Sequence, residues 1–256
     1  MKAQFDATGD VVVITGGANG IGAALARACA AAGASVVICD LDDTAARALM
    51  AAEPRIHYVH LDIADRHKVT RTLGEIEARF GRIDALVCAA AVQPRKPVHE
   101  LSPQQWEQVL QINLNGVVWC YQAVIGGMME RRSGCVLAFS SGLAQTGWPE
   151  SAPYAASKAA LGAFVRSAAK EVACHRVRVN LISPGVIDTR QYREANAGAD
   201  SAHWQDSLGV GAPEDVVGPL MFLLSDAATM TASTLSRDFA YPAQLVDVDN
   251  AKGVLQ

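Results

Sequence analysis

The sequence has no excess of basic residues and no long hydrophobic segment. Its 22 lysine and arginine residues are outnumbered by 26 acidic ones, giving a net charge of −4. A nucleic-acid-binding protein normally carries a basic excess that neutralises phosphates, so we expect no such partner. The longest uncharged apolar stretch covers only residues 116–129, whereas a membrane-spanning helix needs about 20 residues. We therefore expect no membrane partner either.

The sequence also lacks paired cysteine motifs and clustered histidines. The six cysteines, at positions 29, 39, 88, 120, 135 and 174, include no Cys-x-x-Cys pair, and the six histidines are scattered. This pattern favours reduced thiols and no metal site. Residues 1–10 contain three charged residues and lack the apolar core of a signal peptide. We expect a cytoplasmic protein.

Short apolar segments alternate with longer segments of helical periodicity, and no repeat or low-complexity tract interrupts them. The expected strands are residues 11–15, 35–39, 56–60, 83–88, 135–139 and 177–182. The expected helices are residues 21–32, 43–52, 65–80, 103–131, 154–174 and 213–224. This alternation predicts an α/β fold: a doubly wound parallel sheet (Rossmann) with helices on both faces. We expect a single domain over residues 1–240 and a tail over residues 241–256.

The first expected strand runs into the sequence Thr-Gly-Gly-Ala-Asn-Gly-Ile-Gly at residues 15–22. Glycines at 16, 20 and 22 permit a tight turn and close approach of backbone to a ligand. The helix that follows offers free N–H groups to a pyrophosphate. A strand before and a helix after favour a dinucleotide site over the alternative, a glycine-rich turn without a ligand.

Acidic residues end the next two strands. Asp40 lies about 20 residues past the glycines, where a carboxylate accepts hydrogen bonds from both ribose hydroxyls and repels a 2′-phosphate. No arginine or lysine occurs at 17–19 or 41–43 to counter that repulsion. We therefore predict NAD rather than NADP. Asp62 could accept a hydrogen bond from the adenine amino group. Simple helix capping is the alternative for both residues.

Tyr154 and Lys158 are four residues apart and share one face of an expected helix. A phenol has a pKa near 10, but a neighbouring ammonium and a nicotinamide cation would both lower it. Tyr154 is thus a candidate general acid–base. Ser141, at the end of the fifth expected strand, could hold the substrate oxygen. Taken alone, Tyr154 and Lys158 could be an ordinary pair on an exposed helix. Ser141 alone could cap a turn.

With these residues in place, the sequence resembles the short-chain dehydrogenase/reductase family over residues 8–238. The matching pieces are residues 15–22, Asp40, Asp62, Ile112-Asn113, Ser140-Ser141, Tyr154 with Lys158, and Ser183-Pro184-Gly185. The resemblance implies hydride transfer between a nicotinamide and a carbonyl/alcohol pair.

By the same resemblance, Tyr154 exchanges the proton and Ser141 orients the substrate oxygen. Lys158 would bind the nicotinamide ribose and lower the pKa of Tyr154, and Asn113 would hold a water that links Lys158 to solvent. The residues expected to contact NAD are Gly16, Asn19, Gly20, Ile21, Gly22, Asp40, Leu41, Asp62, Ile63, Ala89, Tyr154, Lys158, Pro184, Gly185, Val186, Ile187 and Thr189.

Two segments depart from the family pattern. Residues 88–91 read Cys-Ala-Ala-Ala where relatives have Asn-Asn-Ala-Gly, so we expect weakened cofactor binding and no positive φ at Ala91. Residues 231–232 read Thr-Ala for Thr-Gly, and residues 238–240 read Asp-Phe-Ala for Asp-Gly-Gly. Relatives often use this end at subunit contacts.

Substrate candidates follow the strand ends. They are Gln93, Arg95, Leu143, Trp148, Arg190 and Arg193. The two arginines of the segment 189–211 could hold a carboxylate, sulfonate or phosphate, or could be solvated charges. Trp148 could form an apolar wall or pack in the core.

We expect an NAD(H)-dependent oxidoreductase acting on a secondary alcohol or ketone: a small polyol, sugar-like or ring alcohol. A 3-oxoacyl-thioester reductase is one alternative, and Asp40 argues against its NADP-type pocket. A catalytically silent nucleotide-sensing protein on this fold is another, against which the set of Ser141, Tyr154 and Lys158 argues. Small residues at 155, 156, 159, 160, 162 and 163 suit packing between subunits of a homotetramer or homodimer, or burial within one subunit.

Overall fold

The computed structural model describes residues 3–197 and 209–238. Within these ranges seven strands form one sheet in the order β3-β2-β1-β4-β5-β6-β7, and every neighbouring pair is parallel. The strand order reverses direction between β1 and β4, which is where a doubly wound sheet binds its ligands. The predicted fold class is confirmed. The predicted tail, residues 241–256, lies outside the described residues.

The elements follow the expected alternation closely. The strands are β1 (Val11–Thr15), β2 (Ser35–Asp40), β3 (Ile56–His60), β4 (Ala85–Cys88), β5 (Gly134–Phe139), β6 (Val177–Ser183) and β7 (Thr234–Ser236). The α-helices are α1 (Gly20–Ala31), α2 (Asp43–Ala52), α3 (Arg66–Phe80), α4 (Pro103–Leu110), α5 (Gly116–Arg131), α6 (Leu143–Thr146), α7 (Ala152–Val172), α8 (Arg190–Ala195) and α10 (Val217–Leu224). Short helical turns are η1 (Val98–Glu100), η2 (Gln111–Asn115), η3 (Ala173–His175) and η4 (Pro213–Val216).

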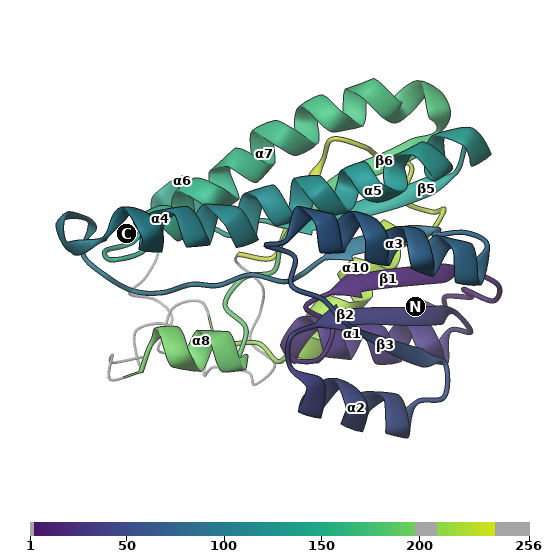
Figure 1. Cartoon of the computed structure of the whole chain (residues 1–256), viewed down its shortest axis with the longest axis horizontal. Coiled ribbons are helices and arrows are strands. Elements are labelled where there is room, and N and C mark those ends of the chain that lie inside the picture. Colours follow the sequence, from purple (N-terminus) through teal and green to yellow (C-terminus); the bar gives the residue numbers. More distant parts are fainter. Residues whose placement is uncertain (1–2, 198–208, 239–256) are drawn as a thin grey trace, which may run out of the picture.

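The sheet is apolar because helices cover both of its faces. All residues of β1 and β4 are buried, and so are all but one residue in each of β5 and β6. One core cluster joins the sheet to α3, α5 and α7, and a second joins the opposite face to α1, α2 and α10. Figure 1 shows α3, α5 and α7 grouped together, with α1 and α2 on the other side of the sheet. Such double coverage explains the continuous hydrophobic strands of the sequence.

One expected helix is interrupted. The span 103–131 contains α4 and α5 joined by η2, a single π-helical turn over Gln111–Asn115. A capping box at Ser102 and Gln105 starts α4, with a proline in its first turn. Single π turns inside helices are often found at functional sites because they redirect one side chain. Here the redirected segment carries Asn113.

No helix in the described part of the chain is long and apolar enough to cross a membrane. Each of the six cysteines is unpaired, and five of them are buried. The exception is Cys174, which is exposed. The described residues contain no group of three or more metal-ligating side chains.

Candidate active site

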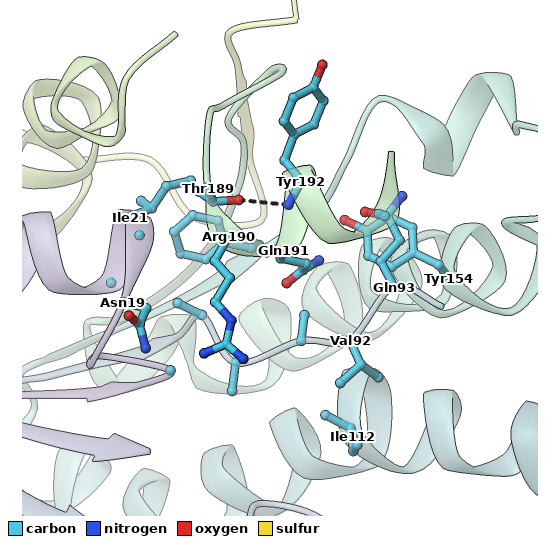
Figure 2. A pocket seen from close by; sticks show the side chains of 18 of the residues that line it. Asn19, Ile21, Val92, Gln93, Ile112, Tyr154, Thr189, Arg190, Gln191 and Tyr192 are labelled. Carbon is cyan, nitrogen blue, oxygen red and sulfur yellow. Dashed lines mark hydrogen bonds between the residues drawn. The ribbon is translucent and has the colours of Figure 1, made fainter. Parts of the chain in front are cut away.

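A cavity of about 900 Å³ lies at the carboxyl ends of the strands. Its walls come from the turn after β1, the ends of β2 and β3, the segments after β4, β5 and β6, and α8. Figure 2 shows this cavity with side chains from these separate segments around it. All seventeen positions predicted to contact a nucleotide line it, and so do Ser141 and five of the six substrate candidates. Arg193 does not line it.

The glycine turn fits a closely bound anion. Gly16 has φ +69°, and a Cβ there would lie 2.6 Å from the backbone nitrogen of Ala90. A Cβ on Gly22 would lie 2.1 Å from the carbonyl oxygen of Gly16. Neither position therefore admits a side chain. The first turn of α1 has no acidic residue, so its free N–H groups remain suited to a phosphate.

Asp40 is fixed by backbone groups at the edge of this turn. Its Oδ2 accepts a hydrogen bond from the Ala18 N–H at 2.9 Å, and its Oδ1 accepts from the N–H groups of Leu41 and Asp42 at 2.8 and 3.0 Å. Each carboxylate oxygen can accept two hydrogen bonds. The remaining capacity of Oδ2 suits a sugar hydroxyl better than a phosphate.

A cation reaches this end of the cavity from a distant part of the sequence. Arg190, at the start of α8, places its guanidinium 3.5 Å from Asp42 Oδ2, and the same carboxylate oxygen accepts from Asn19 Nδ2 at 3.1 Å. Figure 2 shows the Arg190 side chain extending toward Asn19. The sequence has no cation at 17–19 or 41–43, and the structure instead brings Arg190, predicted as a substrate candidate, to the end of the cavity that contains Asp42. Glu194 also binds Arg190, at 2.7 Å, and shares its charge.

The cavity wall carries a buried phenol beside a buried ammonium. Tyr154 is 8% exposed and Lys158 is 3% exposed, and the Lys158 Nζ lies 5.6 Å from the centre of the Tyr154 ring. Lys158 donates a hydrogen bond to the Phe139 carbonyl at 2.8 Å. Burial lowers the pKa of Lys158 to about 8. Ser141 is held nearby, where its Oγ accepts from the Leu143 N–H at 3.2 Å.

Burial raises the pKa of Tyr154, and a hydrogen bond from the Ser141 hydroxyl opposes this rise. The protein alone thus keeps the phenol protonated, whereas the sequence predicts a lowered pKa. That prediction also counts the positive charge of an oxidised nicotinamide ring, which belongs to the loaded enzyme. The contact between Ser141 and Tyr154 places two oxygen atoms where they can hold one substrate oxygen between them.

Asn113 lies behind the cavity and is completely buried. Its Oδ1 accepts from the Val92 N–H at 2.8 Å, and its Nδ2 donates to the Val92 carbonyl at 2.9 Å and to Ser157 Oγ at 3.3 Å. The π turn therefore uses this side chain to fix the segment after β4. Its predicted role in holding a water stays a prediction.

The segment after β4 differs in sequence from the family pattern, but its backbone keeps its hydrogen bond to β1. Ala89 donates its N–H to the Thr15 carbonyl at 3.0 Å, and Ala91 does not have a positive φ, as the sequence predicts. The Thr15 hydroxyl, however, is fully buried and has no hydrogen-bond partner among the residues that the structure describes. Ala232, which stands where relatives have glycine, has φ +58°. Residues 239 and 240 of the second departure lie outside the described residues.

A glycine turn, a buried Tyr–Lys pair and a serine thus lie around one cavity at the carboxyl ends of the strands. The family model described as short chain dehydrogenase matches residues 10–200. The protein belongs to the short-chain dehydrogenase family. Members of this family generally use nicotinamide cofactors.

Similar proteins act on alcohols of different shapes. One is a cis-4-hydroxycyclohexanecarboxylate dehydrogenase of Sinomonas cyclohexanicum, 38% identical over 91% of this chain and 96% of that protein. Another is a cyclopentanol dehydrogenase of Comamonas sp., 34% identical over 91% and 97%. A galactitol 2-dehydrogenase of Agrobacterium fabrum is 33% identical over 89% and 95%. The crystal structure of gox2181 matches with a TM-score of 0.84 at 31% identity, covering 91% of this chain and 96% of that one.

Proposed function

We propose that the protein is an NAD(H)-dependent dehydrogenase of a secondary alcohol, which also reduces the corresponding ketone. The observation that carries the proposal is the meeting of Ser141, Tyr154 and Lys158 on the wall of a cavity that also contains the glycine turn. A small polyol, sugar-like or ring alcohol is the substrate class. The names of the relatives, which act on ring alcohols and on a polyol, support that choice.

The choice of NAD rests on carboxylates. Asp40 and Asp42 both line the cavity at the end of β2, and a 2′-phosphate would meet their negative charge. Arg190 adds one positive charge, but it is already paired with Asp42 and Glu194. The balance at this end of the cavity therefore stays negative, which favours a free ribose hydroxyl.

The residues divide the proton chemistry between them. A nicotinamide, when bound, supplies the hydride acceptor for oxidation or the hydride donor for reduction. Tyr154 Oη accepts the hydroxyl proton of the alcohol in oxidation and returns it to the ketone oxygen in reduction. Ser141 donates a hydrogen bond to the same oxygen. The Lys158 ammonium lies beneath the phenol and favours its ionised form.

The test is an absorbance assay with purified protein, NAD or NADP, and pooled secondary alcohols. The pools are polyols, sugars, ring alcohols, hydroxy acids and hydroxyacyl thioesters. We expect reduction of NAD with at least one of the first four pools. Tyr154→Phe is expected to lower kcat by about 10²–10⁴-fold while NADH still binds. Faster turnover with NADP, or with hydroxyacyl thioesters only, would contradict the proposal.

Asp40→Ala tests the cofactor assignment separately. We expect it to weaken NAD binding and to narrow the ratio of kcat/KM between NAD and NADP. An unchanged ratio would mean that Asp40 does not select the cofactor. Tight NADH binding without turnover in any pool would favour the nucleotide-sensing alternative.

We also propose that the chain forms a homodimer or homotetramer through α7. The small residues that could pack between subunits are not buried within this chain: Ala156, Ala159 and Ala163 are exposed, and their small neighbours are half-buried. Small side chains on an outward face permit close approach of a second helix. This supports subunit contact over burial within one subunit.

A further inference from the structure

Arg95 is a cation on the cavity wall that has only neutral hydrogen-bond partners. It follows β4, and its guanidinium donates to Asn196 Oδ1 at 2.9 Å and to the Pro149 carbonyl at 3.5 Å. Its Nε is buried and has no hydrogen-bond partner in the described part of the chain. No acidic group of the described residues forms a salt bridge with it, although exposed Glu150 contributes an electrostatic attraction.

The other cations of the cavity are already engaged. Arg190 pairs with Asp42 and Glu194 at the nucleotide end. Lys158 is buried beneath the phenol and donates to a backbone carbonyl. Among the described residues that line the cavity, this leaves Arg95 as the positive charge available to a ligand anion.

A second polar group with unused hydrogen-bonding capacity lies close to Arg95. The Tyr192 hydroxyl is buried and has no hydrogen-bond partner within residues 3–197 and 209–238. Asn196 connects the two residues, because it accepts from Arg95 and donates to the Tyr192 carbonyl at 2.7 Å. Arg95 and the Tyr192 hydroxyl also influence each other electrostatically. A buried polar group without a partner destabilises the structure that contains it, so a ligand that supplies a partner is bound more tightly.

The position of this pair separates it from the nucleotide. In Figure 2 the side chains of Arg190 and Tyr192 leave α8 in different directions, Arg190 toward Asn19 and Tyr192 away from it. Arg95 donates to the carbonyl of Pro149, shortly before α7, which carries Tyr154. This contact assigns the cation to the end of the cavity that contains Tyr154. Trp148, 41% exposed, and Leu143 add apolar surface to the same cavity.

Resting on the dehydrogenase function proposed above, we propose that the substrate carries a carboxylate as well as its secondary alcohol. Arg95 binds that carboxylate, and the Tyr192 hydroxyl is a second donor to it. Guanidinium binds carboxylate through paired N–H groups, which fixes the orientation of the substrate as well as its charge. Among the described residues that line this part of the cavity Arg95 is the one cation available to a ligand, and one guanidinium matches a singly charged carboxylate better than a phosphate.

The experiment measures binding to the NADH-loaded protein, a combination in which an alcohol cannot react. Isothermal titration compares 4-hydroxycyclohexanecarboxylate with its uncharged carboxamide. We expect the carboxylate to bind at least about tenfold more tightly. Arg95→Gln is expected to abolish this preference, Arg95→Lys to restore part of it, and Tyr192→Phe to reduce it severalfold.

Lys96→Gln is the matched control, because Lys96 is the adjacent cation, contacts Gln105 and does not line the cavity. It is expected to keep the full preference. NADH affinity and thermal unfolding are measured for every variant, so that loss of the fold is recognised. Equal binding of the two probes to the wild type, or an unchanged preference in Arg95→Gln, would overturn the proposal. Tighter Arg95-dependent binding of cyclohexyl phosphate would also overturn it, in favour of a phosphate. If neither NADH nor NADPH binds, the proposed function itself fails.

Discussion

In the centre of the sheet, the Thr15 side chain lowers the stability of the fold because of the departure from the family pattern at residues 88–91. The Thr15 hydroxyl is buried between Cys39 and Cys88, its partners in register on the two neighbouring strands. A thiol is a weak hydrogen-bonding group, so it cannot replace an amide as a partner. The fold therefore contains an unsatisfied polar atom directly below the glycine turn.

Thr15→Val removes that atom without changing the shape of the side chain. We expect the free energy of unfolding to rise by about 1 kcal/mol, because an unpaired buried hydroxyl no longer has to be desolvated. Urea unfolding measures this change. Thr231→Val is the control of opposite sign, because the Thr231 hydroxyl accepts from the Val179 N–H at 3.0 Å. Destabilisation by Thr15→Val would show that its hydroxyl has a partner in solution.

Lys158 makes stability depend on pH. Its pKa falls from the usual 10.5 to about 8 through burial, so the unfolded chain takes up this proton at a higher pH than the folded one. The contribution of Lys158 is therefore least unfavourable above pH 10.5, worsens as the pH falls toward 8, and is constant below that. The full difference corresponds to about 3 kcal/mol.

Lys158→Met tests this dependence in the absence of nucleotide. We expect the variant to gain stability relative to the wild type at pH 7.5 and to lose about 2 kcal/mol of that gain by pH 9.5. Urea unfolding of both proteins at the two pH values gives the comparison. A difference that does not change with pH would mean that the lysine is better solvated than its burial indicates.

At the scale of elements, the π turn η2 fixes a loop that it does not adjoin in sequence. Asn113 reaches both backbone groups of Val92, which lies 21 residues earlier. Val92 belongs to the cavity wall that also contains Gln93 and Arg95. The geometry of this wall thus depends on one side chain of an irregular helical turn.

We expect Asn113→Ala to destabilise the protein by about 2 kcal/mol, because it leaves the N–H and the carbonyl of Val92 unpaired. We also expect a lower kcat/KM, because the loop behind the substrate loses its attachment. Asn115→Ala is the matched control from the same turn, since Asn115 bonds only to Gln111 among the described residues. Equal effects of the two substitutions would mean that the loss of stability and of kcat/KM comes from disturbing the π turn as a whole, not from the lost bonds to Val92.

The long elements could be predicted from the sequence, and the short ones could not. Runs of valine and isoleucine predicted β1 and β2, and the apolar residues of 177–182 predicted β6, each to within one residue at each end, because nearly all residues of these strands are buried. Helices α6 and α8 and strand β7 have too few residues to show a period. Nothing in the local sequence distinguishes a π turn from the helix around it.

Some residues of the candidate site could likewise be predicted from the sequence, whereas contacts between distant residues could not. The glycines and Asp40 could be placed because they follow strands of known order. The hydrogen bond between Arg95 and Asn196 joins residues 101 positions apart, and that between Arg190 and Asp42 joins residues 148 apart. Such pairs depend on how α8 lies across the end of the sheet. Arg95 itself was predicted as a substrate candidate from its place after a strand end, and it is the first charged residue after the uncharged stretch 85–94.

At the scale of the whole molecule, the exposed small residues of α7 predict the assembly. We expect the purified protein to sediment as a dimer or tetramer, and Ala163→Arg to sediment at a lower mass because a long charged side chain prevents close helix packing. Thr70→Arg, on the exposed face of α3, is the control and should keep the wild-type mass. A monomeric wild-type protein would contradict the proposed contact.

Helix α8 touches both halves of the cavity, and this has a consequence for the order of binding. Arg190 at its start contacts Asp42 at the nucleotide end, while Tyr192 and Asn196 lie beside Arg95 at the other end. A nucleotide that shifts this short helix at Arg190 also shifts Tyr192 and the adjoining Asn196. The two binding events then share one free energy of coupling, and thermodynamic reciprocity requires each ligand to change the affinity of the other by the same factor.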